Sequence, residues 1–357
     1  MKYQSFSYFA LVNTGKSPGV AKKITNTVLA ASNIGLNATS NIFPTNIHGV
    51  INFFISLIRT KSEIVMIRFS DLVFPAVFFA MLFLRMRGRK IIIDVPTPRA
   101  IGLKEFDSAI KIYPIRLARK LWTVLSGPWV LYPAHIIIQY AEEGNWFCFG
   151  IKNKTVKLGN GILIADELPL IETSWPDTTL KLIAVAQVSK WHGYDRVINA
   201  LVEVNKLDLP YTISFTIVGD GDELSNLKAI VKKHSLEEQV FFTGMLLGEN
   251  LNSAFQNAHI GVASLGLYRI GLQDASVLKA REYVARGLSI ICAGADPDFD
   301  DASELRFEVE NNDSLNGLIQ LLSSFENKKL ISPSVARSYA QKKLSLESKL
   351  SKVINTL

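Results

Sequence analysis

Residues 180–224 read LKLIAVAQVSKWHGYDRVINALVEVNKLDLPYTISFTIVGDGDEL. The stretch opens with an apolar run at residues 180–185 and closes with a second run at residues 213–218, just before a glycine-containing turn. Between the two runs, apolar residues recur at the spacing of a helix. Short β-branched runs that alternate with helical-period segments are typical of parallel α/β folds. The stretch therefore predicts a strand, a helix and a second strand of a parallel sheet.

The same alternation extends through the rest of the chain. Strand-like runs lie at residues 6–12, 64–67, 90–95 and 134–139 in the first half, and at residues 180–185, 213–218, 240–243, 260–263 and 289–292 in the second half. A chain of 357 residues is long enough for two domains of roughly 150 residues each. Two series of strands therefore predict two α/β domains, each with its own sheet.

The segment ADELPLIETSWPDTT at residues 165–179 is acidic, contains two prolines and lacks periodicity. Such a segment indicates a linker between domains, which we expect at residues 166–178. The expected domains then span residues 1–165 and 179–335. Residues 336–357 are polar with apolar residues at helical spacing, so we expect a terminal helix that packs back toward the N-terminal domain.

The formal net charge is +7, and basic residues concentrate at residues 85–90 (RMRGRK) and 111–120 (KIYPIRLARK). A basic surface attracts phospholipid headgroups, nucleic acid or phosphorylated substrates, although a solvated basic face has the same signature. The two cysteines, Cys148 and Cys292, lie in different expected domains. This placement argues against a disulfide framework, and it indicates either a reducing compartment or indifference to the redox state of the compartment.

The N-terminal residues MKYQSFSYFALVNTG have the pattern of a first strand rather than of a signal peptide. The most apolar stretch, residues 72–84, contains Pro75 and is shorter than the roughly 18–20 residues needed to cross a bilayer. A buried or interfacial helix is expected there. We therefore expect a cytoplasmic protein, with a peripheral contact at the inner face of the plasma membrane.

Open α/β sheets bind ligands at the carboxyl ends of their strands, so the loops after the strands are the places to search. In the loop NTGKSPGVAKK at residues 13–23, Gly15 and Gly19 would let the backbone approach a phosphate, although an ordinary turn has the same composition. In DVPTPR at residues 94–99, two prolines make a stiff loop that could hold Asp94 or Thr97 toward a cleft. Alternatively, the prolines have only a structural role.

Two loops of the second half carry charged residues beside glycines. In QVSKWHGYDR at residues 187–196, Lys190 and His192 could meet a diphosphate; alternatively, the aromatic residues pack and the cations are solvated. VGDGDEL at residues 218–224 lacks a third glycine at the dinucleotide spacing, which disfavours a nicotinamide enzyme. Asp220 and Asp222 suit either a metal or, at lower cost, a turn.

The segment QDASVLKAREYVARG at residues 273–287 contains the strongest candidates for ligand binding. Ser276 could cap a helix whose first N–H groups face a phosphate, and Asp274 would share a stripe with Glu282. Lys279 lies one turn before Glu282, so a cation for a diphosphate and a carboxylate for ribose hydroxyls would share one face. The alternative is an ordinary Lys–Glu pair on a helix surface.

In this order, the pieces resemble the retaining GT-B glycosyltransferases of family 4. The resemblance is clearest over residues 180–294, through SKWHGYDR, VGDGDEL, FFTG, AHIGVAS and LKAREYVARGLSII, and the first half adds SPGVAKK, DVPTPR and GNGI. It implies a GT-B fold, with two Rossmann-like domains facing one another across a cleft. The C-terminal domain would hold a nucleotide sugar, and the N-terminal domain would contact the acceptor, with Thr97 and Arg99 as candidate contacts.

The resemblance also implies roles for single residues. Glu282 would bind ribose, Lys279 and the amides around Ser276 and Val277 would hold the diphosphate, and residues 242–245 would lie against the nucleobase. The implied donor-binding set is Gly19, Lys190, His192, Gly219, Gly244, Met245, Ser276, Val277, Lys279 and Glu282. Asp274 and Lys279 are the implied catalytic residues, with Asp94 as a candidate base. The chain departs from the family at Asp274, where glutamate is usual, and at Gln187 and His192, where arginine and lysine are common.

The implied reaction transfers a sugar with retention, by front-face attack of the acceptor hydroxyl. No metal or other cofactor is expected, because Asp296 and Asp298, which have a suitable spacing, are interpreted as turn residues. The WHGYDR loop resembles bacterial capsule and exopolysaccharide enzymes, so the expected acceptor is a glycan or a lipid-linked glycan, and no nucleic acid is expected. Two alternatives remain: a sugar-nucleotide epimerase or phosphorylase of the same architecture, and a catalytically silent partner of another transferase.

Overall fold

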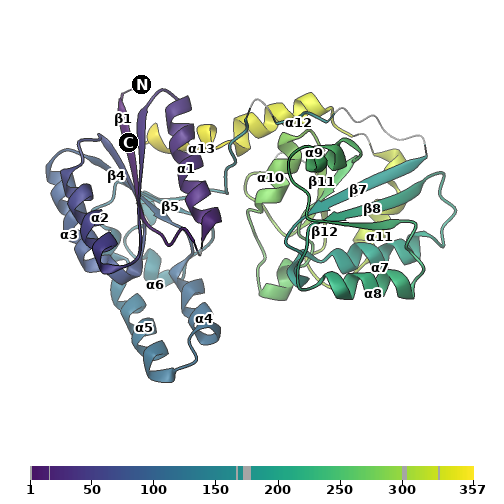
Figure 1. Ribbon diagram of the computed structural model, residues 1–357, viewed down its shortest axis with the longest axis horizontal. Helices are drawn as coiled ribbons and strands as arrows, with labels where there is room; N and C mark the ends of the chain where they lie inside the picture. The colour runs from purple at the N-terminus through teal and green to yellow at the C-terminus, as the bar shows by residue number, and fades with distance from the viewer. Residues whose placement is uncertain (1, 16, 166–167, 172–177, 300–303, 329) are drawn as a thin grey trace. The chain divides into compact units, whose positions relative to one another are not determined.

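Two parallel β-sheets organise the chain, and each lies in a separate unit of the computed structural model (Figure 1). Unit 1 comprises Met1–Gly159 and Leu346–Leu357, and unit 2 comprises Asn160–Ser345. The structure describes residues 2–15, 17–165, 168–171, 178–299, 304–328 and 330–357. Most of the linker predicted at residues 166–178 lies outside the described residues.

The sheet of unit 1 has the strand order β2-β1-β3-β4-β5-β6, and every neighbouring pair is parallel. Its first change of direction falls between β1 and β3, as in other doubly wound sheets. The strands are β1 (Ser5–Leu11), β2 (Asn37–Phe43), β3 (Ile64–Arg68), β4 (Lys90–Val95), β5 (Ile136–Gln139) and β6 (Thr155–Lys157).

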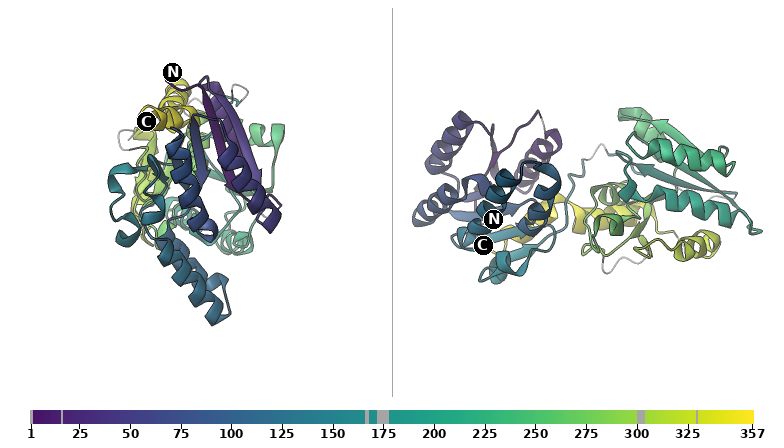
Figure 2. Two further views of the ribbon diagram at one scale, coloured as in Figure 1. Left: turned by 90° about the vertical axis from the view of Figure 1, so that its left-hand side faces the viewer. Right: turned by 90° about the horizontal axis from the view of Figure 1, so that it is seen from below.

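Helices cover both faces of this sheet (Figures 1 and 2). Side chains alternate along β4, so that Ile91 and Ile93 pack with α2 and α3 while Ile92 packs in the core that includes α1 and α13. The helices are α1 (Pro18–Asn33), α2 (Ile47–Arg59), α3 (Phe74–Met86), α4 (Arg99–Ala109), α5 (Tyr113–Ser126), α6 (Asn145–Cys148) and α13 (Leu346–Ile354), with short 3-10 turns η1 (Asp71–Val73), η2 (Trp129–Leu131) and η3 (Lys152–Lys154).

The sheet of unit 2 has the order β12-β11-β10-β7-β8-β9 and is also parallel. Counted within the unit, this is the 3-2-1-4-5-6 order of Rossmann folds read from the other edge. Its topological switch point therefore lies between β7 and β10. The strands are β7 (Thr179–Val185), β8 (Thr212–Val218), β9 (Val240–Gly244), β10 (Ile260–Val262), β11 (Ser289–Ala293) and β12 (Arg306–Val309).

Helices also cover both faces of the second sheet. Helices α7, α8 and α11 pack on one face, around Leu182 and Phe215, and α9, α10 and α12 pack on the other, around Ile183 and Ile290. The helices are α7 (Tyr194–Val204), α8 (Leu224–Lys233), α9 (Gly248–Gln256), α10 (Leu278–Ala285), α11 (Asn316–Ser323) and α12 (Pro333–Tyr339), with short turns η4 (Lys190–His192), η5 (Leu267–Ile270), η6 (Phe325–Asn327) and η7 (Ala340–Leu344).

The apolar stretch at residues 72–84 forms most of α3. Met81 and Leu84 are fully buried, whereas Phe79 is 68% exposed, so one face of the helix packs on the sheet and the other does not. None of the helices in the described part of the chain is long and apolar enough to cross a membrane.

Candidate functional site

The loops after β7 and β10 meet at the switch point of unit 2. The backbone N–H of Leu265, after β10, donates to the carbonyl of His192, after β7, at 2.8 Å. Gly193 has φ +68°, and a Cβ atom there would lie 2.8 Å from the backbone nitrogen of Gly266. Only glycine fits this close approach. The loops after β7 and β10 therefore meet at the switch point, which is where open α/β sheets bind ligands.

Arg269 on η5 fixes the loop that carries Lys190. Its guanidinium donates to both carboxylate oxygens of Asp195, at 2.7 and 2.8 Å, and to the carbonyl of Lys190 at 2.8 Å. The hydrogen bonds with Asp195 raise the pKa of Arg269 above its usual value. Lys190 itself is exposed, so its ammonium remains open to an anionic ligand.

His192 is buried in the same loop, and its Nδ1 accepts a hydrogen bond from the N–H of Ser189 at 3.0 Å. Its ring lies 4.0 Å from that of Trp191 and 5.4 Å from that of Tyr194, between centroids. Burial, and then the charge of Lys279, lower the pKa of His192 to about 3. His192, which was predicted as a cation, is therefore a neutral imidazole at physiological pH. The packing of the aromatic rings in this loop buries it.

Lys279 lies in the first turn of α10 and points toward the loop after β7. Its Nζ donates to the hydroxyl of Tyr194 at 3.1 Å and lies over the rings of Trp191 and Tyr194, 5.6 and 5.5 Å from their centroids. Burial lowers the pKa of Lys279 to about 7. An anionic ligand beside it would favour the charged ammonium.

Glu282 lies one turn later on α10 and has a different partner. Its Oε1 accepts a hydrogen bond from Nε of the buried Arg286 at 3.1 Å, and Nη2 of the same guanidinium forms an ion pair with it at 3.1 Å. Arg286 also donates to Asn252 of α9 at 3.0 Å and stacks 4.3 Å from the centroid of Phe255. The Glu282 side chain is 40% exposed, so its carboxylate is held in place yet accessible. The simple Lys279–Glu282 surface pair is not formed.

The segment before α10 differs from the prediction. The helix begins at Leu278, with Val277 as N-cap and no side-chain cap. The hydroxyl of Ser276 instead accepts from the N–H of Asn160, whose side-chain amide donates to the Ser276 carbonyl at 2.8 Å. Asp274 is extended and forms a parallel bridge with Ala295, so it does not share a helical stripe with Glu282. The Ser276 hydroxyl, which was expected to cap the helix, is thus hydrogen-bonded to Asn160 of the GNGI turn.

Asp296 and Asp298, whose spacing resembles a metal site, both bind Arg281. The fully buried guanidinium donates to both oxygens of Asp296, one at 2.7 Å, and to Asp298 at 2.6 Å. It also donates to the carbonyls of Asn160 and Val277, at 3.1 and 3.2 Å. Among the described residues, no group of three or more His, Cys, Asp or Glu side chains could hold a metal ion.

Loops after β8 and β9 lie side by side. Gly219 has φ +124°, and a Cβ atom there would come within 1.9 Å of the Ala186 carbonyl oxygen. Its N–H donates to the carbonyl of Gly244 at 2.8 Å. Gly244 also has a positive φ, +71°, and the next residue, Met245, is 73% exposed. An apolar side chain is thus presented to solvent at the end of β9.

The predicted residues of unit 1 have mixed surroundings. Asp94 is fully buried, and its Oδ2 accepts from Tyr8 and, at 2.9 Å, from Arg68. Burial, followed by the charge of Asp94, raises the pKa of Tyr8 well above its usual value. This closed arrangement does not favour Asp94 as a base for an incoming hydroxyl. Gly19 and Thr97 are exposed.

Arg99 is buried, and this corrects its prediction as an acceptor contact. Its guanidinium donates to the carbonyls of Gly127 and Phe147 and pairs with Glu143 at 3.4 Å. Burial lowers the pKa of Arg99 despite the nearby carboxylate. Arg99 therefore ties α4 to the rest of unit 1.

The structure brings most of the predicted donor residues together in unit 2. Residues from the loop after β7 and from α10 meet through Tyr194 and Lys279. Gly219, Gly244 and Met245 follow the neighbouring strands β8 and β9. Sequence reasoning missed Arg269, because its partner Asp195 is 74 residues away. Arg286 could have been found from its i, i+4 spacing with Glu282.

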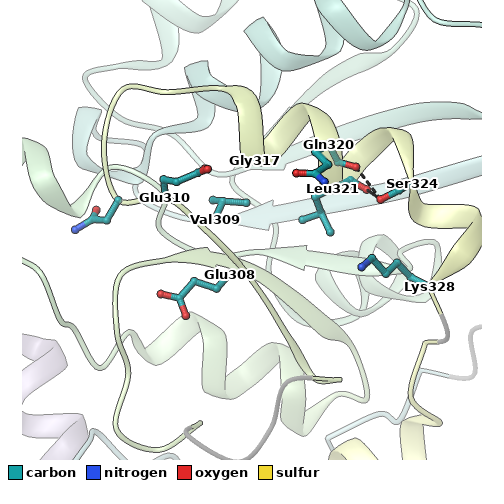
Figure 3. Close-up of a pocket in the computed structure, with 9 residues that line it drawn as sticks. Glu308, Val309, Glu310, Gly317, Gln320, Leu321, Ser324 and Lys328 are labelled. Atoms are coloured by element: carbon teal, nitrogen blue, oxygen red, sulfur yellow. Dashed lines mark hydrogen bonds between the residues drawn. The ribbon is translucent and has the colours of Figure 1, made fainter.

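A separate pocket of about 570 Å³ opens on unit 2 at the edge strand β12 (Figure 3). It is lined by Glu308, Val309, Glu310, Asn311, Gly317, Gln320, Leu321, Ser324 and Lys328. Ser324 donates to the carbonyl of Gln320 at 2.7 Å within it. None of the predicted ligand-binding residues lines this pocket, and it lies outside the switch point.

Comparisons with known proteins bear on both the site and the fold. Residues 171–294, which include β7 to β11 and the switch point, match the family model described as glycosyl transferases group 1. No curated protein matches the chain.

Several solved structures are similar to the whole chain. The lipopolysaccharide outer core galactosyltransferase WaaB in its apo form is 11% identical, with 99% of each chain covered and a TM-score of 0.61. A glycosyltransferase from Rickettsia africae is 14% identical, with 99% of this chain and 98% of that chain covered and a TM-score of 0.63. Anabaena HepE in complex with UDP and glucose is 12% identical, with 99% and 100% covered and a TM-score of 0.61. Together with the two six-stranded parallel sheets, these likenesses confirm the predicted GT-B fold of two Rossmann-like domains.

Proposed function

We propose that this protein is a glycosyltransferase that takes a sugar from a nucleotide-diphosphate sugar held by unit 2. The observation that carries the proposal is the set of direct contacts at the switch point between the elements that hold Lys190, Lys279 and Glu282. These elements fall within the residues that match glycosyl transferases group 1. HepE, a structure of similar fold, was solved with UDP and with UDP-glucose.

The geometry supports a division of labour among the donor residues. Glu282, held by Arg286 and still accessible, would accept the ribose hydroxyls. Lys190, Lys279 and the uncapped amides at the start of α10 near Val277 would hold the diphosphate. Gly244 and Met245 would lie against the base, with Gly219 shaping the adjacent loop, and Gly19 would contribute from unit 1.

In the proposed reaction, the bond between the anomeric carbon and the diphosphate breaks, and the oxygen of the acceptor hydroxyl bonds to that carbon on the same face. The hydroxyl proton passes to an oxygen of the departing diphosphate. The negative charge that develops on the leaving group would be stabilised by Lys190, Lys279 and helix amides, without a metal ion or other cofactor. The buried neutral His192 would then act as a hydrogen-bonding group and a support for the loop rather than as a cation.

The proposed acceptor is a glycan or lipid-linked glycan of bacterial surface polysaccharide synthesis, bound from unit 1, where Thr97 is exposed. The sugar that we propose to be transferred is a hexosyl group. The proposed setting is the cytoplasm, with peripheral contact at the inner face of the plasma membrane.

A calorimetric titration with UDP, GDP, ADP and CMP, on the intact chain and on Glu282→Ala, tests the donor site. We expect one nucleotide to bind selectively and Glu282→Ala to weaken it by about tenfold to a hundredfold, because ribose loses a charged acceptor. Glu203→Ala, an exposed carboxylate on α7, is the matched control and should bind as the intact chain does. Tight binding without turnover on any acceptor would favour the silent partner; no binding of any nucleotide would contradict the donor site.

The pKa of Lys279 predicts that donor binding depends on pH. In the free protein Lys279 loses its proton around pH 7, and a bound diphosphate should raise its pKa. Binding then takes up a proton above pH 7, so affinity should be constant below pH 7 and fall by up to about tenfold per pH unit above it. Calorimetry in buffers of different ionisation enthalpy measures the proton uptake. Equal affinity from pH 6 to pH 9 would contradict this assignment.

A further inference from the structure

Exposed apolar side chains are concentrated in unit 1, although the two units are of similar length. Among the described residues, 29 large apolar side chains are exposed, and 22 of them belong to unit 1. The seven of unit 2 are Leu207, Phe241, Met245, Leu247, Ile270, Leu278 and Val335. This excess makes unit 1 the place to search for a contiguous apolar face.

Helix α5 carries the clearest part of this face, because its polar side is turned inward. Arg119 pairs with Asp71 of η1 at 3.2 Å, and Lys120 pairs with Asp107 of α4 at 2.6 Å. Thr123, on the same side, is buried. Helices α4 and α5 run as a pair that extends from the rest of unit 1 (Figures 1 and 2). The charged side of the helix is thus used to hold the pair together.

The outward side of α5 is apolar. Leu117, Leu121 and Leu125 recur at a spacing of four residues and are 44%, 55% and 63% exposed. Two tryptophans border them: Trp122 donates through Nε1 to the Asp71 carbonyl at 2.7 Å, and Trp129 donates to the Leu125 carbonyl at 2.7 Å. Each tryptophan is also 37% exposed. Tryptophan, an apolar ring with one polar N–H group, is enriched at the membrane–water interface.

Basic residues are also in excess on the α4–α5 pair. Residues 99–120 contain six lysines and arginines against two acidic residues. Lys104 of α4 and Lys111, just before α5, are exposed. A polyanion such as nucleic acid would satisfy the cations but leave the leucines in water. An anionic bilayer satisfies both, since headgroups meet the cations while acyl chains cover the leucines.

We propose that the outward face of α5, formed by Leu117, Leu121 and Leu125 with the bordering tryptophans and cations, docks on an anionic lipid bilayer. This inference gives the proposed peripheral membrane contact a location, and it concerns α5 rather than the apolar segment at residues 72–84. The face lies on the unit proposed to bind the acceptor. Docking would therefore bring that unit to the membrane surface where a lipid-linked acceptor resides.

Flotation with vesicles, in the absence of nucleotide, tests the docking face separately from the donor site. The intact chain should float with vesicles of phosphatidylglycerol and phosphatidylcholine, and much less with phosphatidylcholine alone or at high salt. The variant Leu117→Gln/Leu121→Gln/Leu125→Gln should lose about a hundredfold in partitioning, because three exposed leucines no longer insert. Glutamine keeps the helix propensity, so thermal unfolding should be little changed.

Leu207→Gln/Val335→Gln in unit 2 is the matched control, and it should float as the intact chain does. Equal flotation of the triple variant and the intact chain would overturn the proposal. Failure of the intact chain to float with anionic vesicles would also overturn it. If the intact chain does not float but forms a dimer that the triple variant converts to a monomer, the face is a dimer interface instead. Nucleotide binding is measured without lipid. A negative flotation result would therefore contradict the docking face without contradicting the proposed donor site.

Discussion

Lys279→Met is expected to reduce turnover about a hundredfold to a thousandfold, the loss typical of removing one preorganised group that stabilises charge in the transition state. The ammonium lies at the start of α10, where burial holds its pKa at about 7. A bound diphosphate would charge it fully and use that charge as the leaving group departs. Methionine has a similar length, so the packing against Trp191 and Tyr194 is retained. Steady-state kinetics with the selected donor measures the loss.

Two comparisons make the Lys279 result specific. Lys206→Met, in the exposed turn after α7, removes a cation of the same kind and should leave turnover unchanged. Thermal unfolding of Lys279→Met should match that of the intact chain or exceed it, because a desolvated cation is removed. The affinity of this variant should also lose its dependence on pH above 7. Turnover within threefold of the intact chain would exclude Lys279 from the chemistry.

Arg281→Met is expected to cost about 3–5 kcal/mol in the free energy of unfolding, as for other buried ion pairs that lose one partner. The fully buried guanidinium pairs with Asp296 and Asp298. Without it, both carboxylates lose the buried cation that they share. Its hydrogen bonds to Asn160 and Val277 are lost as well, which loosens the segment before α10. Chemical denaturation monitored by circular dichroism measures the change.

The carboxylates provide the control for Arg281. In Arg281→Met/Asp296→Asn/Asp298→Asn the charges of both carboxylates are removed as well, so part of the lost stability should return. Lys206→Met breaks the exposed pair with Glu203 and should cost less than about 1 kcal/mol. A loss below that value for Arg281→Met would mean that the buried cluster contributes little to the fold.

The interior strands of each sheet and the edge strand β9 could be predicted from the sequence, but the other edge strands could not. Strands such as β4 and β8 lie between two others, so their apolar runs are continuous. Three strands were missed: β2, β6 and β12, each at a sheet edge. The sequence of β2, NATSNIF, is largely polar because several of its side chains face solvent. Edge strands are recognised through their neighbours, which single-sequence periodicity does not reveal.

The candidate site was predictable where the motif lies within one loop or helix. Lys279 and Glu282 share α10, and the glycines at 193, 219 and 244 are required by positive φ or close backbone approach. What failed was the state of the side chains. His192 was taken for a cation, and Arg99 for an acceptor contact, but both are buried. Burial depends on residues distant in sequence, such as Glu143 for Arg99.

The same limit explains why the arginines that organise unit 2 were missed. Arg196 reaches the carbonyls of Glu310 and Ser314, more than 110 residues away, at 3.0 and 2.7 Å. Arg269 reaches Asp195 over a similarly long stretch of chain. In the sequence, such arginines look like any other surface cation. Only the folded backbone shows which carbonyls and carboxylates they serve.

Helix α13 gives the protein an unusual order of assembly during synthesis. Leu350, Val353 and Ile354 of α13 belong to the hydrophobic core of unit 1, together with residues of β1 and α1. Those residues are translated only after all of unit 2. Domains generally fold as units while the ribosome is still at work, the first one first. Here unit 2 is contiguous in sequence and can fold as soon as it has been synthesised. Unit 1 is synthesised first, but its hydrophobic core lacks the α13 side chains until the end of translation, so unit 1 finishes folding second.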